Sequence, residues 1–492
     1  MNEVELALGV GAAVLLLAVL AVRVSTRLGL PSLLLYLAIG LLLGESGLGI
    51  EFSDTSLTAT LGVAGLVLIL AEGGLTTRLS VIRPALRPGI ALSTVAVVLS
   101  IAITGSAAHL LLGLDWRTGL LWGAVLSSTD AAAVFSVLRS LKVSPRLAGA
   151  LELESGINDA PVYIAVVLIA SGDPLRWWTP LLVGYELLVG ALVGAALGLA
   201  GAWTLRRAAL PATGLYPLAT IAVCVLAFAA GQGLHASGFL ATYLAGLILG
   251  NAKLPHRGDT RSFAEGLGWL AQIGLFVLLG LYASPVRLPG ALIPALVAGA
   301  VLVVLARPLS VLLSLTPLRV PWREQVFLSW AGLRGAVPIV LALIALTMGV
   351  PGAQRLVDVV FVLVVLLTVV QGVTLPSVVR WLGLSRPEQG REIVVDYAPL
   401  DEMDADLLQV RVPRPSRLHG VYLSELRLPV GAMVSLVVRN GQGFTPLPTT
   451  RLQEGDQLLV VTTAGKRDQA ERRIRAVHRA GRLAQWRGET GA

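Results

Sequence analysis

Residues Glu154 to Pro161 read Glu-Ser-Gly-Ile-Asn-Asp-Ala-Pro, and this polar octet lies inside an otherwise apolar segment, residues 147–170. An apolar segment of about 20 residues is long enough to cross the hydrocarbon core of a bilayer. An ionisable side chain at that depth costs at least about 2.5 kcal/mol, so it marks a candidate functional site. The octet therefore predicts a membrane-spanning helix that carries a buried polar centre.

The remainder of the chain also has the composition of a protein that lies mostly in lipid. Of its 492 residues 55% are hydrophobic and 14% are charged, and the mean hydropathy is +0.78. We expect an all-α polytopic membrane protein of about 13 transmembrane helices. The predicted spans are roughly 6–24, 30–48, 57–77, 89–112, 117–138, 147–170, 180–205, 215–233, 236–252, 264–283, 289–314, 323–349 and 355–382.

The basic residues predict the orientation of these spans. Eighteen Lys and Arg residues lie in one alternating set of connecting segments, against four in the other set. Cytoplasmic loops carry the excess, so we expect the N-terminus outside the cell and the C-terminus in the cytoplasm. Because the basic residues form no single patch, the net charge of +8 does not indicate a nucleic-acid partner. The partners expected are membrane lipid in the cell membrane and no nucleic acid.

The composition changes near residue 385, where the transmembrane domain of residues 1–384 gives way to a charged linker over 385–406. Beyond it, alternating apolar patterns predict short β-strands and a basic helix, and so a small cytoplasmic α+β domain over 407–477. A basic, disordered tail is expected over 478–492. The domain carries no GxGxxG motif, so a complete dinucleotide-binding fold is not indicated.

Two spans are predicted to be broken. Asp130 follows Ser127-Ser-Thr129, whose hydroxyl groups compete with the backbone for hydrogen bonds and favour unwinding. Arg334 lies in Gly332-Leu-Arg-Gly-Ala-Val-Pro338, and Pro338 cannot donate a helical hydrogen bond. The two spans run in opposite directions, as inverted repeats with two broken, crossing helices require.

The carboxylates of the octet are expected to have different roles. Ser155 and Asp159 are four residues apart and share one helix face, whereas Glu154 and Asn158 share another. Oxygen ligands of this kind suit a hard cation, and a proton can compete with that cation for the same carboxylate. Such competition produces antiport when the protein changes its accessible face only with the site occupied.

Buried arginines need carboxylate partners. We assign Glu154 to Arg334, which leaves Asp159 for the ion, and pairing of Arg334 with Asp130 is the alternative. Glu72, in the third predicted span, either pairs with Arg307 or lines the path of the ion.

Three motifs in this order closely resemble the NhaP-type branch of the monovalent cation:proton antiporter superfamily: Thr129-Asp130, Asn158-Asp159 and Gly332-Leu-Arg-Gly335. The resemblance covers about residues 1–384. The segment from Leu407 to Val477 resembles the TrkA-C (RCK-C) regulatory domain. Together they resemble the potassium/proton antiporters linked to cell-volume regulation and pH homeostasis.

The resemblance implies a thirteen-helix homodimer whose six-helix core moves against a scaffold as an elevator. It implies that the cation is bound by Asp130, Asp159, Ser155 and the main chain of Thr129, and that Glu154 pairs with Arg334. Asn158 in place of a second adjacent acid implies electroneutral exchange of one cation for one proton. The transported ions would be H⁺ and either K⁺ or Na⁺, with K⁺ favoured by the TrkA-C-like segment from Leu407 to Val477. No cofactor is expected, although the C-terminal domain is expected to sense a small regulatory ligand such as a nucleotide.

Two other transporter classes remain as alternatives. A ligand-gated cation channel would use a carbonyl filter such as TVGYG, and none is present in the sequence. A sodium-coupled symporter of an organic solute would need counterflow of that solute. An enzyme is not expected, because the sequence has neither HExxH nor GxSxG.

Overall fold

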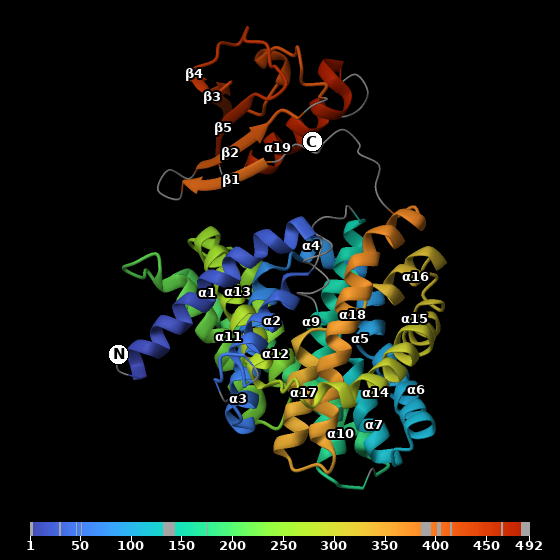
Figure 1. Ribbon diagram of the computed structural model, residues 1–492. Helices are drawn as coiled ribbons and strands as arrows, with labels where there is room; N and C mark the ends of the chain where they lie inside the picture. Colours follow the sequence, from blue (N-terminus) through green and yellow to red (C-terminus); the bar gives the residue numbers. More distant parts are fainter. Residues whose placement is uncertain are drawn as a thin grey trace. The chain divides into compact units, whose positions relative to one another are not determined.

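The computed structural model describes the chain in ten stretches and divides it into two units, Met1–Ser385 and Arg386–Ala492 (Figure 1). The first unit is helical and the second contains a β-sheet. The described residues are 3–28, 31–45, 47–50, 52–130, 143–174, 176–384, 395–400, 405–413, 416–463 and 466–483.

The first unit is built from helices, which confirms the predicted all-α membrane architecture. Within the described residues, eight helical stretches are long and apolar enough to cross a membrane, and four further apolar helices are shorter. The count of thirteen spans stays a prediction. The helices are α1 (Glu3–Leu28), α2 (Ser32–Leu43), α3 (Thr55–Thr76), α4 (Leu79–Ile82), α5 (Leu86–Ser93), α6 (Val95–Leu112), α7 (Trp116–Ser127), α9 (Pro145–Ala170), α10 (Thr179–Arg207), α11 (Leu215–Gly233), α12 (Gly238–Asn251), α13 (Arg257–Tyr282), α14 (Leu288–Ala300), α15 (Arg307–Leu315), α16 (Trp322–Trp330), α17 (Ala336–Thr347) and α18 (Ala353–Trp381).

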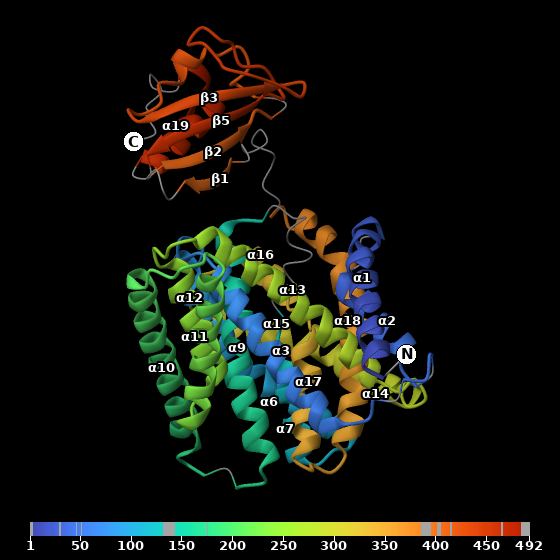
Figure 2. The ribbon, with the colours of Figure 1, turned by 90° about the vertical axis from the view of Figure 1, so that its left-hand side faces the viewer.

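By their contacts the helices of this bundle (Figures 1 and 2) form two groups, which also touch each other where α3 meets α17 and α9 meets α12. In the core body α6 packs on α7, α5 on α9, and α18 on both α14 and α17. In the scaffold body α12 packs on α3, α10 and α11, while α13 packs on α2 and α3. We call α4–α9 with α14–α18 the core body, and α1–α3 with α10–α13 the scaffold body.

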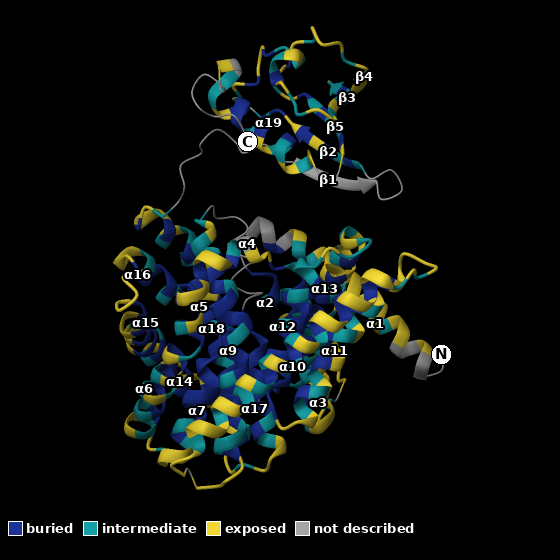
Figure 3. Ribbon diagram, turned by 180° about the vertical axis from the view of Figure 1, so that it is seen from behind, coloured by how far each residue is buried: buried dark blue, intermediate teal, exposed yellow. Residues whose placement is uncertain are grey.

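The packing reflects an environment of lipid rather than water. Large apolar side chains such as Leu188, Leu192 and Val304 are exposed on the outside of the bundle, while the buried residues gather in its middle (Figure 3). Small residues allow close helix approach. At Gly194 in α10 an added Cβ would collide with the main chain of Ala241 in α12.

Both predicted helix breaks are present, and they meet. Helix α7 ends at Ser127 and the next residues are extended, while α16 ends at Trp330 and α17 begins at Ala336. The main-chain N–H of Asp130 donates to the carbonyl of Leu333 at 3.0 Å, which ties one non-helical segment to the other. Residues 131–138 of the predicted fifth span lie outside the described residues.

The prediction was wrong about the cause of the second break. Pro338 lies in the first turn of α17, where no main-chain donor is needed. The non-helical residues are 331–335, before the proline, and two of them are glycines. Proline inside a helix does not enforce a break either, because α9 continues through Pro161.

The second unit is a five-stranded antiparallel sheet in the order β1-β2-β5-β3-β4, with helix α19 (Arg467–Ala480) packed on it. Its core joins Leu408, Val460 and Ile474. The strands are β1 (Val395–Leu400), β2 (Ala405–Arg411), β3 (Ala432–Arg439), β4 (Gln442–Phe444) and β5 (Gln457–Thr463).

This sheet corrects the predicted linker. Strand β1 and the start of β2 fall inside 385–406, although the sequence there is rich in charged residues. An edge strand is held by main-chain pairing to one neighbour, so it does not need the apolar alternation by which strands are recognised. At the other end α19 reaches Ala480, and residues 484–492 of the predicted tail lie outside the described residues.

Candidate functional site

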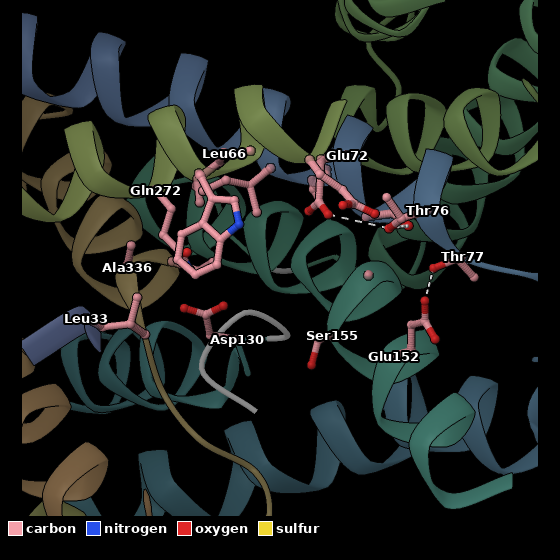
Figure 4. Close-up of a pocket in the computed structure, with 18 of the residues that line it drawn as sticks. Leu33, Leu66, Glu72, Thr76, Thr77, Asp130, Glu152, Ser155, Gln272 and Ala336 are labelled. Atoms are coloured by element: carbon pink, nitrogen blue, oxygen red, sulfur yellow. Dashed lines mark hydrogen bonds between the residues drawn. The ribbon is translucent and has the colours of Figure 1, made fainter. Parts of the chain in front are cut away.

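A cavity of about 850 Å³ lies in the helical unit and is lined in part by α3, α9 and α13 (Figure 4). Asp130, Asp159, Ser155 and Thr129 all line it beside the two interrupted helices. Towards its other end it is lined by charged side chains from the loop after α3 and from the start of α13. These are Arg78, Arg261 and Glu265.

We call that end of the unit the arginine-rich end, because the termini of many helices place arginines there. Among the described residues they include Arg23, Arg78, Arg83, Arg87, Arg146, Arg206, Arg207, Arg257, Arg261, Arg319, Arg323 and Arg380. The cavity therefore connects the predicted ion site to the arginine-rich end.

Asp130 and Asp159 form the acidic inner end of the cavity. Each side chain is buried, at 7% exposure. Oδ1 of Asp159 has no hydrogen-bond donor among the described residues. The Asp130 carboxylate packs against Gly335, where an added Cβ would collide with it. Both residues therefore line the cavity, and Asp159 keeps one buried oxygen to which no described group donates.

Hydroxyl and amide groups join the unwound segment to α9. The Asn158 amide Nδ2 donates to the Thr129 hydroxyl at 2.6 Å, and that hydroxyl lies 3.3 Å from the Ser155 hydroxyl. All three side chains are buried. Because a buried polar group that loses its partner costs about 1–3 kcal/mol, these bonds hold residues 128–130 in place. Asn158 thus positions the segment that carries Asp130.

Glu154 has a different partner from the one predicted. Its Oε1 lies 2.5 Å from Nη1 of Arg307, and both side chains are almost fully buried. Arg307 follows a π-helical turn, Val301–Ala306, that sets its direction, and Nη2 of Arg307 also donates to the carbonyl of Leu328. The predicted ion pair of Glu154 with Arg334 is therefore corrected to Arg307.

Arg334 remains part of the same electrostatic group. It is 1% exposed and interacts electrostatically with both Glu154 and Arg307. Its main-chain carbonyl accepts a hydrogen bond from Thr368, whereas its Nε and Nη1 have no acceptor among the described residues. One carboxylate thus lies near two guanidinium groups.

The buried charges of the helical unit are few and nearly balance. One buried carboxylate of the described part of this unit, Asp358, pairs with Arg287 far from the arginine-rich end. The other buried charged side chains described there are Asp130, Glu154, Asp159, Arg307 and Arg334. With every group ionised, three carboxylates face two guanidinium groups. One further positive charge at the inner end of the cavity would complete the balance.

The remaining predicted residue, Glu72, lies on the cavity wall and accepts a hydrogen bond from the Thr76 hydroxyl at 3.5 Å. Glu152 also lines the cavity and was not predicted, although it lies three and seven residues before Ser155 and Asp159 and so shares their face of α9. The Thr77 hydroxyl donates to Glu152. Nothing in the sequence indicated Thr77, because its role depends on how α3 and α9 are placed.

The buried charge group predicts an asymmetric effect on stability. Glu154→Gln leaves Arg307 and Arg334 without their shared carboxylate, whereas Arg307→Gln leaves Glu154 beside Arg334. We expect the first change to cost about 3–5 kcal/mol and the second clearly less. The measurement is thermal unfolding of the purified protein in detergent. Arg261→Gln, at the exposed ion pair with Glu265, is the control and should change stability little. Equal losses for Glu154→Gln and Arg307→Gln would contradict the shared-carboxylate arrangement.

Comparison with known proteins agrees with the geometry. Residues 12–381 match the family model for the transmembrane sodium/hydrogen exchanger, and residues 407–475 match the TrkA-C domain. The chain is 41% identical over 396 residues to the K(+)/H(+) antiporter NhaP of Alkalimonas amylolytica, covering 79% of this chain and 69% of that protein. It is 36% identical over 464 residues to the K(+)/H(+) antiporter NhaP2 of Shewanella baltica, covering 92% and 80%.

A solved structure shares the fold. The sodium proton antiporter MjNhaP1 from Methanocaldococcus jannaschii superposes with a TM-score of 0.69 over 78% of this chain and all of that one, at 24% identity. At that identity the similarity concerns the fold alone. The match of the family model to most of the chain and the identity to the NhaP relatives go further, and the chain belongs to the sodium/hydrogen exchanger family, with a TrkA-C domain at its C-terminal end.

Proposed function

We propose that this protein is a secondary active antiporter of the cell membrane that exchanges one cytoplasmic K⁺ for one external proton at Asp159 and Asp130. The observation that carries the proposal is the inner end of the cavity, where two buried carboxylates, the Ser155 hydroxyl and the unwound segment at Thr129 meet. These are oxygen ligands of the kind that an alkali cation requires. A proton on Asp159 would remove the charge that holds the cation, so the two ions exclude each other.

The balance of buried charge supports an electroneutral, one-for-one exchange. With Glu154 committed to Arg307, the two site carboxylates and Arg334 leave a single negative charge. One monovalent cation or one proton neutralises it. The loaded site then has the same net charge in both halves of the cycle, so the membrane potential does no net work on the exchange.

Alternating access by an elevator movement is supported by the contacts between the two bodies. Gly62 of α3 faces Val340 of α17, and Gly156 of α9 faces the ring of Tyr243 in α12. At both contacts only one body contributes a side chain, so a sliding core body would not have to move two side chains past each other. Since the arginine-rich end is the cytoplasmic end by the positive-inside rule, the cavity corresponds to an inward-facing state.

Potassium is favoured over sodium by the relatives. The NhaP and NhaP2 proteins of Alkalimonas and Shewanella are named K(+)/H(+) antiporters, whereas the more distant relative of Methanocaldococcus jannaschii is named a Na(+)/H(+) antiporter. The first two match this chain at 41% and 36% identity and the third at 28%.

We further propose a homodimer with the TrkA-C domain in the cytoplasm, where it senses a small ligand.

The first test removes the charge of Asp159. In proteoliposomes acidified inside, added external K⁺ should dissipate the pH gradient, as read by a pH-sensitive dye, and Asp159→Asn should abolish this. Glu186→Gln, a half-buried carboxylate of α10 that does not line the cavity, is the matched control and should exchange normally. Normal exchange by Asp159→Asn would show that the site is assigned wrongly.

The same vesicles test the stoichiometry and the cation. Because the exchange is proposed to be electroneutral, clamping the membrane potential with a lipophilic cation should leave the initial rate unchanged, and K⁺ should have a lower KM than Na⁺. A rate that follows the imposed potential would contradict one-for-one exchange. Flux that follows the potential without proton movement would instead favour the channel alternative.

A truncation tests the TrkA-C domain. Ending the chain at Ser385, the boundary of the helical unit, should preserve exchange while altering its dependence on cytoplasmic pH or on added nucleotide. An unchanged response to both would exclude regulation by this domain. The control is the full-length chain at the same density in the vesicles.

A further inference from the structure

Three carboxylates on α9 lie within a stretch of eight residues, and only Asp159 takes part in the proposed exchange. Glu154 turns away from the cavity toward Arg307. Glu152 and Asp159 both line the cavity, with Ser155 and Gly156 between them on the same wall. Seven residues of α-helix rise about 10 Å. Glu152 is thus displaced from Asp159 by about two turns along α9, in the direction of its N-terminus.

Glu152 is held by a group of the scaffold body. Figure 4 shows the Thr77 hydroxyl, at the end of α3, donating to the Glu152 carboxylate. The Thr77 carbonyl accepts from Nδ2 of Asn251 at 2.9 Å, and Oδ1 of Asn251 accepts from the N–H of Leu79 at 2.9 Å. Asn251 therefore fixes the residue that presents the hydroxyl. The bond joins core and scaffold at the cavity wall.

A second polar group points to the same place. Tyr243 of α12 lines the cavity, is 1% exposed, and its hydroxyl has no hydrogen-bond partner among the described residues. It interacts electrostatically with Glu152. The other charged groups that line this part of the cavity are Glu72 and Arg78 at the end of α3 and Arg261 and Glu265 of α13. Arg261 interacts electrostatically with Glu152 as well.

We propose that Glu152 is a proton-relay residue, which takes the proton released by Asp159 and delivers it to the cytoplasm. The inference rests on the proposed function. The Asp159 carboxylic acid gives its proton to water in the cavity, whose volume and polar lining admit several molecules. The Glu152 carboxylate accepts that proton and then releases it to cytoplasmic water. Each transfer leaves one acid and one carboxylate, so no other reactant is needed.

The geometry favours a relay over simple attraction of the cation. Glu152 is half-buried, so it exchanges protons with the aqueous mouth, whereas Asp159 is buried. Both stand on one continuous helix, so their separation is kept if the core body moves. The Thr77 hydroxyl stabilises the Glu152 carboxylate between transfers. This contact exists only while α9 lies beside the end of α3, which restricts the relay to the inward-facing state.

The test measures exchange in proteoliposomes as a function of K⁺ concentration. Glu152→Gln should lower the maximal rate roughly tenfold, less than the usual loss of a general acid or base because water can partly replace the relay, while the KM for K⁺ stays the same. A high concentration of a mobile buffer, imidazole, on the cytoplasmic side should restore the rate. Glu152→Asp should retain most of it.

Two further variants distinguish a relay from a loss of charge at the cavity mouth and from a loss of the ion site. Glu265→Gln removes the same charge from the mouth of the same cavity and should keep the maximal rate. Asp159→Asn should stay inactive with or without imidazole, and activity there would overturn the proposed function rather than the relay.

Three results in Glu152→Gln would overturn the relay: an unchanged maximal rate, a raised KM alone, or a loss of rate that imidazole does not restore. Matching thermal unfolding of Glu152→Gln and the unmodified chain excludes a folding defect.

Discussion

The arrangement of the membrane unit depends on the neutralisation of two buried guanidinium groups. Arg307 and Arg334 cannot lose their charge in the bilayer, and a buried charge without a counterion costs several kcal/mol. Glu154 supplies the counterion for Arg307 at 2.5 Å and lies near Arg334. Because Glu154 is committed in this way, Asp130 and Asp159 are the carboxylates to which we assign the proposed exchange. The positions of the arginines therefore decide which carboxylate is held in an ion pair.

The proposed ion site depends on the crossing of the two interrupted helices. A continuous helix satisfies its own carbonyls and offers none to a cation. Here the N–H of Asp130 and the carbonyl of Leu333 bond across the crossing, while Asn158 holds Thr129 to α9. Gly335 leaves room for the Asp130 carboxylate where any side chain would collide. The segments are therefore non-helical yet fixed. The conformational entropy of ordering them is lost when the protein folds, and not when an ion binds.

Much of this could be predicted from sequence because membrane proteins follow strict local rules. Apolar length predicted the helical architecture, and helix periodicity separated the face of Asp159 and Ser155 from that of Glu154 and Asn158. The first break was expected from hydroxyl residues, whereas the second was expected from Pro338 and lies instead in the residues before it, two of which are glycines. The partner of Glu154 was not predictable, since Arg307 reaches it only after a π-helical turn shifts the register of its helix. Strand β1 was missed because its charged sequence reflects an edge position, not the absence of pairing.

The π-helical turn at Val301–Ala306 has a consequence for how this site can change over time. A π-turn amounts to one residue inserted into an α-helix, and one residue corresponds to about 100° of rotation. Deleting a single residue of the turn would let the helix continue as an α-helix with Arg307 still facing Glu154, whereas winding the turn into α-helix at constant length would swing the Arg307 side chain away. The length of an apolar segment, and not only its chemistry, thus helps to decide which carboxylate pairs with Arg307.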